Sequence, residues 1–171
     1  DAIAAVLAGL TDPLERVTRQ RMTETWNTVT GGVDMTIALL DGQAHQNWLG
    51  IARALHAANR CTDPHGAIVI CTQAREALGK AFGRLRRSQL TSRTLSEQLS
   101  RDSSDDAIAA AVVHEATQEK HVYLVSEMQP QVMESLRLGV IAQEGELQHL
   151  VDQFSSVLVL GSAQHRQIEL A

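Results

Sequence analysis

The chain has 171 residues, 44% of them hydrophobic, and a formal net charge of −5 at pH 7. This length and composition suit one domain of ordinary size around a single core. An acidic chain lacks the basic field that attracts polyanions, and two Trp, one Tyr and two Phe residues leave few platforms for stacking bases. We therefore expect no nucleic-acid partner.

No stretch of the sequence approaches the roughly 20 consecutive apolar residues that span a bilayer. The N-terminal residues DAIAAVLAGLTDP also lack the basic region and the cleavage site of a secretory signal. We expect a soluble, cytoplasmic protein with no membrane partner. Because the sequence begins at Asp1 and not at a methionine, we expect residues 1–171 to be a single α/β domain of a longer protein.

The first part of the chain predicts two helices. Residues 1–10 repeat apolar side chains at helical spacing. A second helical pattern starts at Asp12, carries Trp26 on its apolar side, and is expected to end at Gly31 and Gly32.

The next elements alternate between strand and helix. Residues 33–40 and 66–71 are rich in β-formers and almost continuously apolar, which is typical of strands covered on both faces. The helix between them places Trp48, Ile51 and Leu55 at spacings of three and four, which predicts one stripe packed on a sheet. This alternation favours βαβ units with right-handed crossovers.

The remaining elements continue this pattern, interrupted by a polar stretch that we expect to be a flexible or partly helical connection and not a functional lid. In chain order we predict a helix over 74–88, the polar stretch 88–106, helices over 106–120, 129–139 and 144–154, and strands over 122–126 and 157–160. The predicted fold is α/β and Rossmann-like in three layers, with helices on both faces of a mainly parallel sheet of at least four strands. Those strands are 33–40, 67–72, 122–126 and 157–160.

Ligands of open α/β sheets bind where the carboxyl ends of the strands meet, because loops diverge there and helix N-termini present free N–H groups. The segments expected at that edge are Asp41–Asn47, Thr72–Arg75, Ser126–Gln129 and Gly161–Gln164. None of them contains the glycine patterns of dinucleotide or nucleoside triphosphate sites. The residues alone therefore indicate a parallel α/β domain without assembled catalytic machinery.

Metal-binding and thiol chemistry are not indicated either. The seven histidines are scattered and have no spacing typical of metal ligands, so we expect this chain to bind no metal. His45 is placed in the first turn after the first strand, where it could reach a ligand. We favour reduced, buried thiols for Cys61 and Cys71, with a disulfide or a nucleophile as the alternatives.

Two stretches, taken together, resemble a known family. QNWLGIARALHAANRCTDPHGAIVIC resembles the part of the nickel-dependent lactate racemase C-terminal domain where a DQN turn opens a helix and a glycine precedes a buried strand. HVYLVSEMQPQVMESLRLGVIAQEGELQHLVDQFSSVLVL resembles the closing segment of that domain. The resemblance covers residues 33–160, except for the polar middle.

The resemblance implies that this chain is the C-terminal domain of a 2-hydroxy acid racemase or epimerase and forms one wall of an interdomain active-site cleft. In that family the N-terminal domain holds a nickel pincer nucleotide, so the cofactor is expected in that domain and not in this chain. The expected partners are the N-terminal domain of the same protein and a small 2-hydroxy acid. The alternative is a non-catalytic α/β binding or assembly module that kept the fold and lost the chemistry.

The resemblance also implies site residues at the start of the helix. Gln46 and Asn47 match the family's turn and His45 replaces its aspartate, so these three residues are the expected substrate-binding positions. The alternative for Gln46 and Asn47 is a structural role at the helix start, where their side chains satisfy backbone donors.

The family's C-terminal domain contributes a tyrosine, a glutamine and a lysine, and the matching positions here are Leu49, Gly50 and Arg53. Arg53 is the candidate catalytic residue, because it keeps the positive charge and can meet a carboxylate through a bidentate fork. At 3.6 residues per turn it lies about 140° from Trp48, so we expect Arg53 and Leu49 to be accessible and Arg53 to form no internal salt bridge. Leu49 and Gly50 cannot hydrogen-bond through side chains, which favours a 2-hydroxy acid other than lactate, or an inactive relative. The alternative for Arg53 is an ordinary exposed helix residue.

Overall fold

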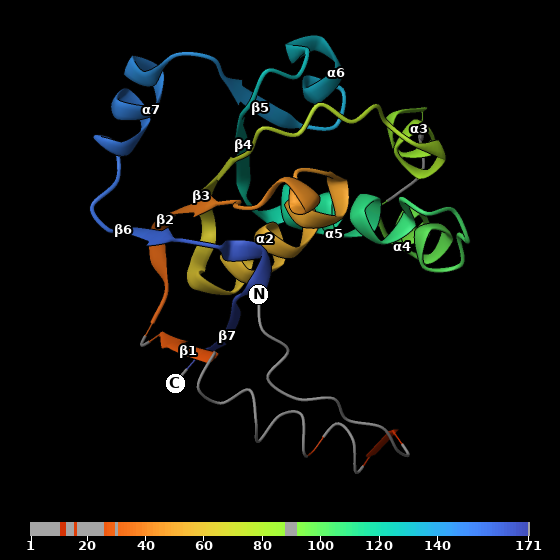
Figure 1. Cartoon of the computed structure of the whole chain (residues 1–171), viewed down its shortest axis with the longest axis horizontal. Coiled ribbons are helices and arrows are strands. Elements are labelled where there is room, and N and C mark those ends of the chain that lie inside the picture. Colours follow the sequence, from red (N-terminus) through yellow and green to blue (C-terminus); the bar gives the residue numbers. More distant parts are fainter. Residues whose placement is uncertain (1–10, 13–15, 17–25, 30, 88–91, 171) are drawn as a thin grey trace.

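The computed structural model describes residues 11–12, 16, 26–29, 31–87 and 92–170 (Figure 1). The elements in chain order are β1 (Trp26–Val29), β2 (Val33–Leu39), η1 (Gln43–His45), α2 (Trp48–Cys61), β3 (Thr62–Cys71), α3 (Lys80–Arg87), α4 (Ser92–Ser100), α5 (Ala107–Glu119), β4 (His121–Val125), α6 (Pro130–Glu134), β5 (Leu138–Ile141), α7 (Glu144–Val151), β6 (Val157–Leu160), η2 (Ala163–His165) and β7 (Gln167–Leu170).

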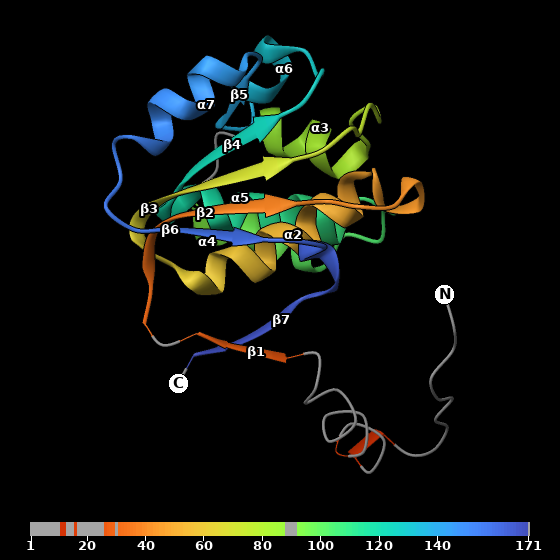
Figure 2. The ribbon, with the colours of Figure 1, turned by 60° about the vertical axis from the view of Figure 1, so that its left-hand side comes forward.

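A five-stranded parallel sheet in the order β5-β4-β3-β2-β6 forms the centre of the molecule. Figure 2 shows the arrows of β2, β3, β4 and β6 pointing the same way, with the β1–β7 pair set apart from the sheet. Ile37 of β2 lies between Val69 of β3 and Val159 of β6. The predicted parallel sheet of at least four strands is confirmed, and the chain reverses its direction across the sheet between β2 and β6.

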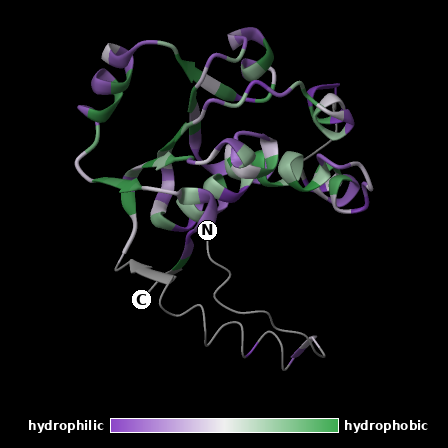
Figure 3. Cartoon of the chain, in the orientation of Figure 1, coloured by the Kyte–Doolittle hydropathy of each residue, from purple (hydrophilic) through white to green (hydrophobic). Residues whose placement is uncertain are grey.

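Helices cover both faces of this sheet, as predicted. The helices α2, α3, α4 and α5 lie on one side and α7 on the other (Figures 1 and 2). Alternating strand residues divide between two cores: Ile68 and Ile70 pack with α2 and α5, whereas Val69 packs on the α7 side. Figure 3 shows the hydrophobic character of β5 and β6; in β6 Leu160 is buried, whereas Val157 and Val159 are exposed.

The predicted stripe of α2 is confirmed, because Trp48, Ile51 and Leu55 are 3%, 1% and 0% exposed. Within the described segments, no helix has the length and apolarity needed to cross a membrane.

The N-terminal prediction is wrong at its end. Trp26–Val29 form strand β1, paired in parallel with Gln167–Leu170, and not the last turn of a helix. The partner strand lies at the other end of the chain, so local periodicity carried no sign of it. Thr11, Asp12 and Arg16 are helical. The rest of the two predicted helices up to residue 25 lies outside the described residues.

The helix predicted over 74–88 is too long, because α3 begins only at Lys80. The Asp106 carboxylate accepts hydrogen bonds from the backbone N–H groups of Ala81 (3.2 Å) and Phe82 (3.1 Å), which caps the helix there. A Cβ at Gly79 would lie 2.4 Å from an Asp106 oxygen, so a side chain there would displace the capping carboxylate. A cap from a residue outside the helix decides where it starts.

Two further segments refine the predictions. The polar stretch is partly helical, as expected: α4 runs over Ser92–Ser100 and buries Leu95 and Leu99. Gly139 does not end a helix as predicted but lies inside strand β5, where a Cβ would meet the Tyr123 ring at 2.4 Å. The strand is too short for its alternation to be visible, and its pairing with β4 defines it.

Candidate functional site at the carboxyl edge of the sheet

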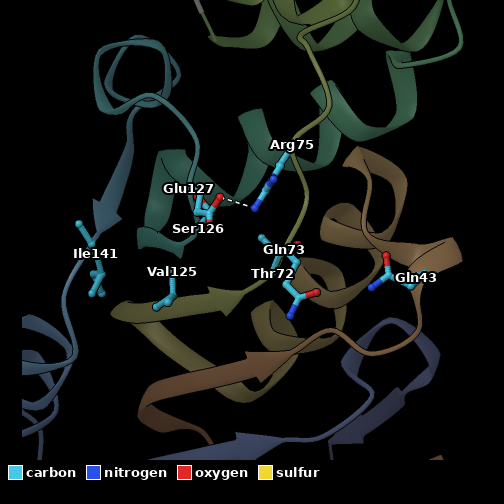
Figure 4. A pocket seen from close by; sticks show the side chains of 9 residues that line it. Gln43, Thr72, Gln73, Arg75, Val125, Ser126, Glu127 and Ile141 are labelled. Atoms are coloured by element: carbon cyan, nitrogen blue, oxygen red, sulfur yellow. Dashed lines mark ion pairs between the residues drawn. The ribbon is translucent and has the colours of Figure 1, made fainter.

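Two adjoining hollows, together called the edge depression, lie at the carboxyl ends of strands β2 to β5. One has a volume of about 640 Å³ and the other about 400 Å³. They share four lining residues, Gln43, Thr72, Gln73 and Val125. Figure 4 shows the larger hollow, with the apolar Val125 and Ile141 on one side of the view and polar loop side chains above and beside them. Three of the four segments predicted for this edge line the edge depression, and the fourth, Gly161–Gln164, contacts Asp41, which lines the smaller hollow.

Gln46 joins the loop after β2 to the loop after β3. Its side-chain oxygen accepts hydrogen bonds from the Thr72 hydroxyl (2.8 Å) and the Gln73 backbone N–H (2.7 Å). Its amide nitrogen donates to the Leu40 carbonyl (3.3 Å). The oxygen and the nitrogen of the Gln46 amide are therefore both hydrogen-bonded within the protein. Gln46 also lines the smaller hollow. A role in substrate binding stays a prediction.

Asn47 is the N-cap of α2, the structural role that the sequence left open for it. Its side-chain oxygen accepts from the Gly50 N–H (2.8 Å), and its side-chain nitrogen donates to the Ala44 carbonyl (3.0 Å). The next backbone N–H, of Trp48, donates to a Glu76 carboxylate oxygen at 3.0 Å. The start of α2 is therefore anchored by side chains from two loops.

Gly50 is buried at a point where no side chain fits. A Cβ there would lie 1.9 Å from the carbonyl oxygen of His45, an atom of the backbone. The family's side-chain contact at this position therefore has no counterpart while η1 keeps its place.

Asp41 connects the ends of β2 and β6, where the sheet order reverses. Its carboxylate accepts hydrogen bonds from the Ser162 hydroxyl and the Gln164 side-chain amide, and its backbone carbonyl accepts from the same amide at 3.0 Å. The rings of His45 and His165 meet edge to face beside it, with centroids 4.6 Å apart. The hydrogen bonds from Ser162 and Gln164 lower the pKa of the Asp41 carboxyl, although burial acts in the opposite direction.

The Asp41 carboxyl is expected to titrate below its usual pKa of about 3.9. Because this acid has a lowered pKa in the folded state, its contacts stabilise the fold above about pH 4 and lose that effect as the pH falls through the folded-state pKa. NMR of the Asp41 carboxyl carbon across the acid pH range measures the midpoint of this titration. Ser162→Ala should raise the midpoint, since that hydroxyl is the largest cause, whereas the exposed-site control Ser155→Ala should not. An unchanged midpoint in Ser162→Ala would contradict this assignment.

Arg53 and Leu49 are both exposed, as predicted, and Leu49 is 44% accessible. Among the described residues no ion pair to Arg53 is found. Arg53 does not line either hollow of the edge depression. Its catalytic role stays a prediction, and any contact with a ligand must come from the outer side of α2.

The sequence did not single out Arg75, Glu127 and Ser126 as individual site residues. Arg75 and Glu127 form an ion pair of 2.5 Å between the loops after β3 and β4, and both side chains point across the larger hollow (Figure 4). Ser126 lies beside them and accepts a hydrogen bond from the Met128 N–H at 3.4 Å. Their place directly after two predicted strands was the available signal.

The described part of the chain shows no arranged site for metal binding or for thiol chemistry. No group of three His, Cys, Asp or Glu side chains is placed there to hold one metal ion. Cys61 is buried and Cys71 half-buried; both thiols are free, and burial raises the pKa of each. The described residues do not fit the nickel centre of the family that the sequence resembles.

Comparison with known proteins identifies the fold. No protein-family model matches the chain, and no curated protein matches its sequence. The fold resembles that of a lactate racemase. The lactate racemase apoprotein from Thermoanaerobacterium thermosaccharolyticum matches with a TM-score of 0.76 at 15% identity, over 92% of this chain and 40% of that one. A protein from Thermotoga maritima matches with a TM-score of 0.58 at 11% identity, over 91% and 42%. At such identities the likeness concerns the fold, and this chain spans less than half of either neighbour.

Proposed function

We propose that this chain is the C-terminal domain of a racemase or epimerase acting on a 2-hydroxy acid, and that its carboxyl edge forms one wall of an interdomain cleft. The observation that carries the proposal is the fold match to the lactate racemase apoprotein, with a TM-score of 0.76 over 92% of this chain. Because one fold hosts many functions, the location also matters. The edge depression lies where open α/β sheets bind ligands, which supports that choice of wall.

In this proposal the cleft is completed by an N-terminal domain of the same protein. That domain would bind the nickel pincer nucleotide, which supplies hydride transfer when bound. This chain's residues then bind and orient the substrate and exclude water from one side. Arg53 is proposed to reach the substrate from the outer side of α2, with Leu49 beside it as apolar cleft wall. His45, Gln46 and Asn47 are proposed to hold the loop that borders the substrate.

A non-catalytic binding or assembly module is the second candidate. It is favoured by the start of α2, where Gln46 and Asn47 make internal hydrogen bonds and Gly50 has no room for a side chain. A domain that retained its fold without catalysis would keep such structural bonds. The two candidates differ in whether the full-length protein interconverts the enantiomers of any 2-hydroxy acid.

Arg53→Ala in the full-length protein is expected to lower racemase kcat/KM by about tenfold or more, which corresponds to about 1.4 kcal/mol of transition-state stabilisation. The guanidinium is a charged hydrogen-bond donor for the substrate, and alanine removes it. Chiral chromatography of both 2-hydroxy acid enantiomers measures the rates. The unfolding midpoint should not change, because the side chain is exposed.

Arg93→Ala is the matched control, since that side chain is 91% exposed on α4 and pairs with Glu97 within the same helix. It should leave kcat/KM unchanged. Equal activity of Arg53→Ala and wild type would assign Arg53 to an ordinary solvated face. Absence of racemase activity in the cofactor-loaded wild-type protein, towards every 2-hydroxy acid tested, would favour the non-catalytic module.

A further inference from the structure

The Arg75–Glu127 ion pair stands between the edge depression and a second hollow, called the side groove. The side groove has a volume of about 470 Å³ and lies between the irregular segment before α3 and the segment of α6. The larger hollow of the edge depression and the side groove both include Arg75 and Glu127 among their lining residues. Ala77, Leu78, Met128, Val132 and Met133 form the apolar part of the side groove, and its other lining residues, beside the ion pair, are Glu76, Arg86 and Gln129. A single ligand can therefore contact both hollows at this ion pair.

Arg75 is suited to bind an incoming carboxylate. It is 73% exposed and its Glu127 partner 74%, and such exposed pairs are held weakly because water competes for both charges. A guanidinium carries five N–H donors, and the ion pair is formed by one of its terminal nitrogens, Nη2. A ligand carboxylate can thus bind the guanidinium as a two-bonded fork, beside Glu127 or in its place.

The two hollows differ in chemistry, which orients such a ligand. The edge depression offers the hydroxyl of Ser126 near Arg75 and the side-chain amides of Gln43 and Gln73 among its lining groups. The side groove offers thioether and branched apolar side chains, which suit a hydrophobic substituent. Arg86 is the other cation of the side groove, but it does not line the edge depression.

We infer that the edge depression and the side groove together bind a 2-hydroxy acid with a bulky apolar substituent. Arg75 holds the carboxylate of this ligand. The hydroxyl lies in the edge depression among Ser126 and the two glutamines, and the substituent lies in the side groove against Leu78 and Val132. The choice of a 2-hydroxy acid rests on the proposed function, whereas the carboxylate and the apolar substituent follow from the residues of the site. This assigns the carboxylate to Arg75; Arg53 lines neither the edge depression nor the side groove, and Arg53→Ala tests its proposed role separately.

The test compares two probes, sodium lactate and sodium 3-phenyllactate, by NMR titration of the full 171-residue chain against sodium chloride at matched ionic strength. Phenyllactate is expected to bind about tenfold tighter than lactate, because its phenyl ring is transferred from water into the side groove. Saturable shifts are expected at Gln73, Ser126 and Leu78. Equal affinity for the two probes, or shifts that sodium chloride reproduces, would overturn the inference.

Variants test the edge depression and the side groove separately. Arg75→Gln should weaken both probes by about tenfold, and Arg75→Lys by less, since lysine keeps the charge but not the fork. Leu78→Gln should weaken phenyllactate alone. Leu78 is half-buried and Arg75 exposed, so both variants are expected to fold. The control Arg93→Gln should bind both probes as wild type does, and unchanged binding in Arg75→Gln would refute the assignment.

Activity of the full-length protein distinguishes this inference from the proposed function. If that protein racemises lactate as readily as phenyllactate and Arg75→Gln retains full activity, the inference fails and the proposed function stands. If the binding pattern holds but the cofactor-loaded protein racemises no 2-hydroxy acid, the site stands and the proposed function fails.

Discussion

Gly50→Ala is expected to destabilise the protein by about 2–3 kcal/mol, the upper range for forcing an extra carbon into a packed site. Helix propensity alone predicts the opposite sign, since alanine is about 1 kcal/mol better than glycine inside a helix. The contact decides the outcome: the new Cβ would lie 1.9 Å from the His45 carbonyl oxygen. Either η1 or the first turn of α2 must move, and Gln43 of η1 lines the edge depression.

Urea unfolding of wild type and variant measures this change through the midpoint at constant slope. Gly145→Ala in α7 is the matched control, because a Cβ there meets nothing within 4 Å. That control should be neutral or stabilise by up to about 1 kcal/mol. A stabilised Gly50→Ala would mean that the loop before α2 yields easily and that the position tolerates a side chain after all.

Phe82→Ala is expected to cost about 3–5 kcal/mol, the usual range for deleting a buried aromatic ring. Phe82 is 0% exposed, and its ring centroid lies 4.4 Å from that of Trp48. This contact joins α3 to the start of α2. Losing it leaves a cavity and frees the loop that separates the edge depression from the side groove.

The same urea experiment measures the loss, with Phe154→Ala as the control. Phe154 is half-buried and packs on the α7 face, so its truncation should cost clearly less. A cost for Phe82→Ala no greater than for Phe154→Ala would contradict the packing described for α3. In that case the 72–79 segment would not depend on Phe82 for its position.

The candidate site shows how far local patterns reach. The four segments expected at the carboxyl edge could be predicted because strand ends follow from apolar runs, and parallel strands bring their carboxyl ends to one edge. The side chains that meet there could not, since Arg75 and Glu127 belong to different loops and only the β3–β4 pairing brings them together. From the sequence, Gly50 was interpreted as a position that lacks a side-chain contact. In the structure a glycine is required there, because the His45 carbonyl at the end of η1 leaves no room for a Cβ.

The sequence by itself determined the strands β2, β3, β4 and β6 and the buried apolar stripe of α2. In these elements the spacing of apolar residues within a few positions identifies the kind of element, so periodicity predicts it. Only the tertiary structure decided the β1–β7 pair, strand β5 and the start of α3 at Lys80. Their partners, from the C-terminal strand to the Asp106 carboxylate, are distant in the chain, and hydrogen bonds formed on folding override the local preference.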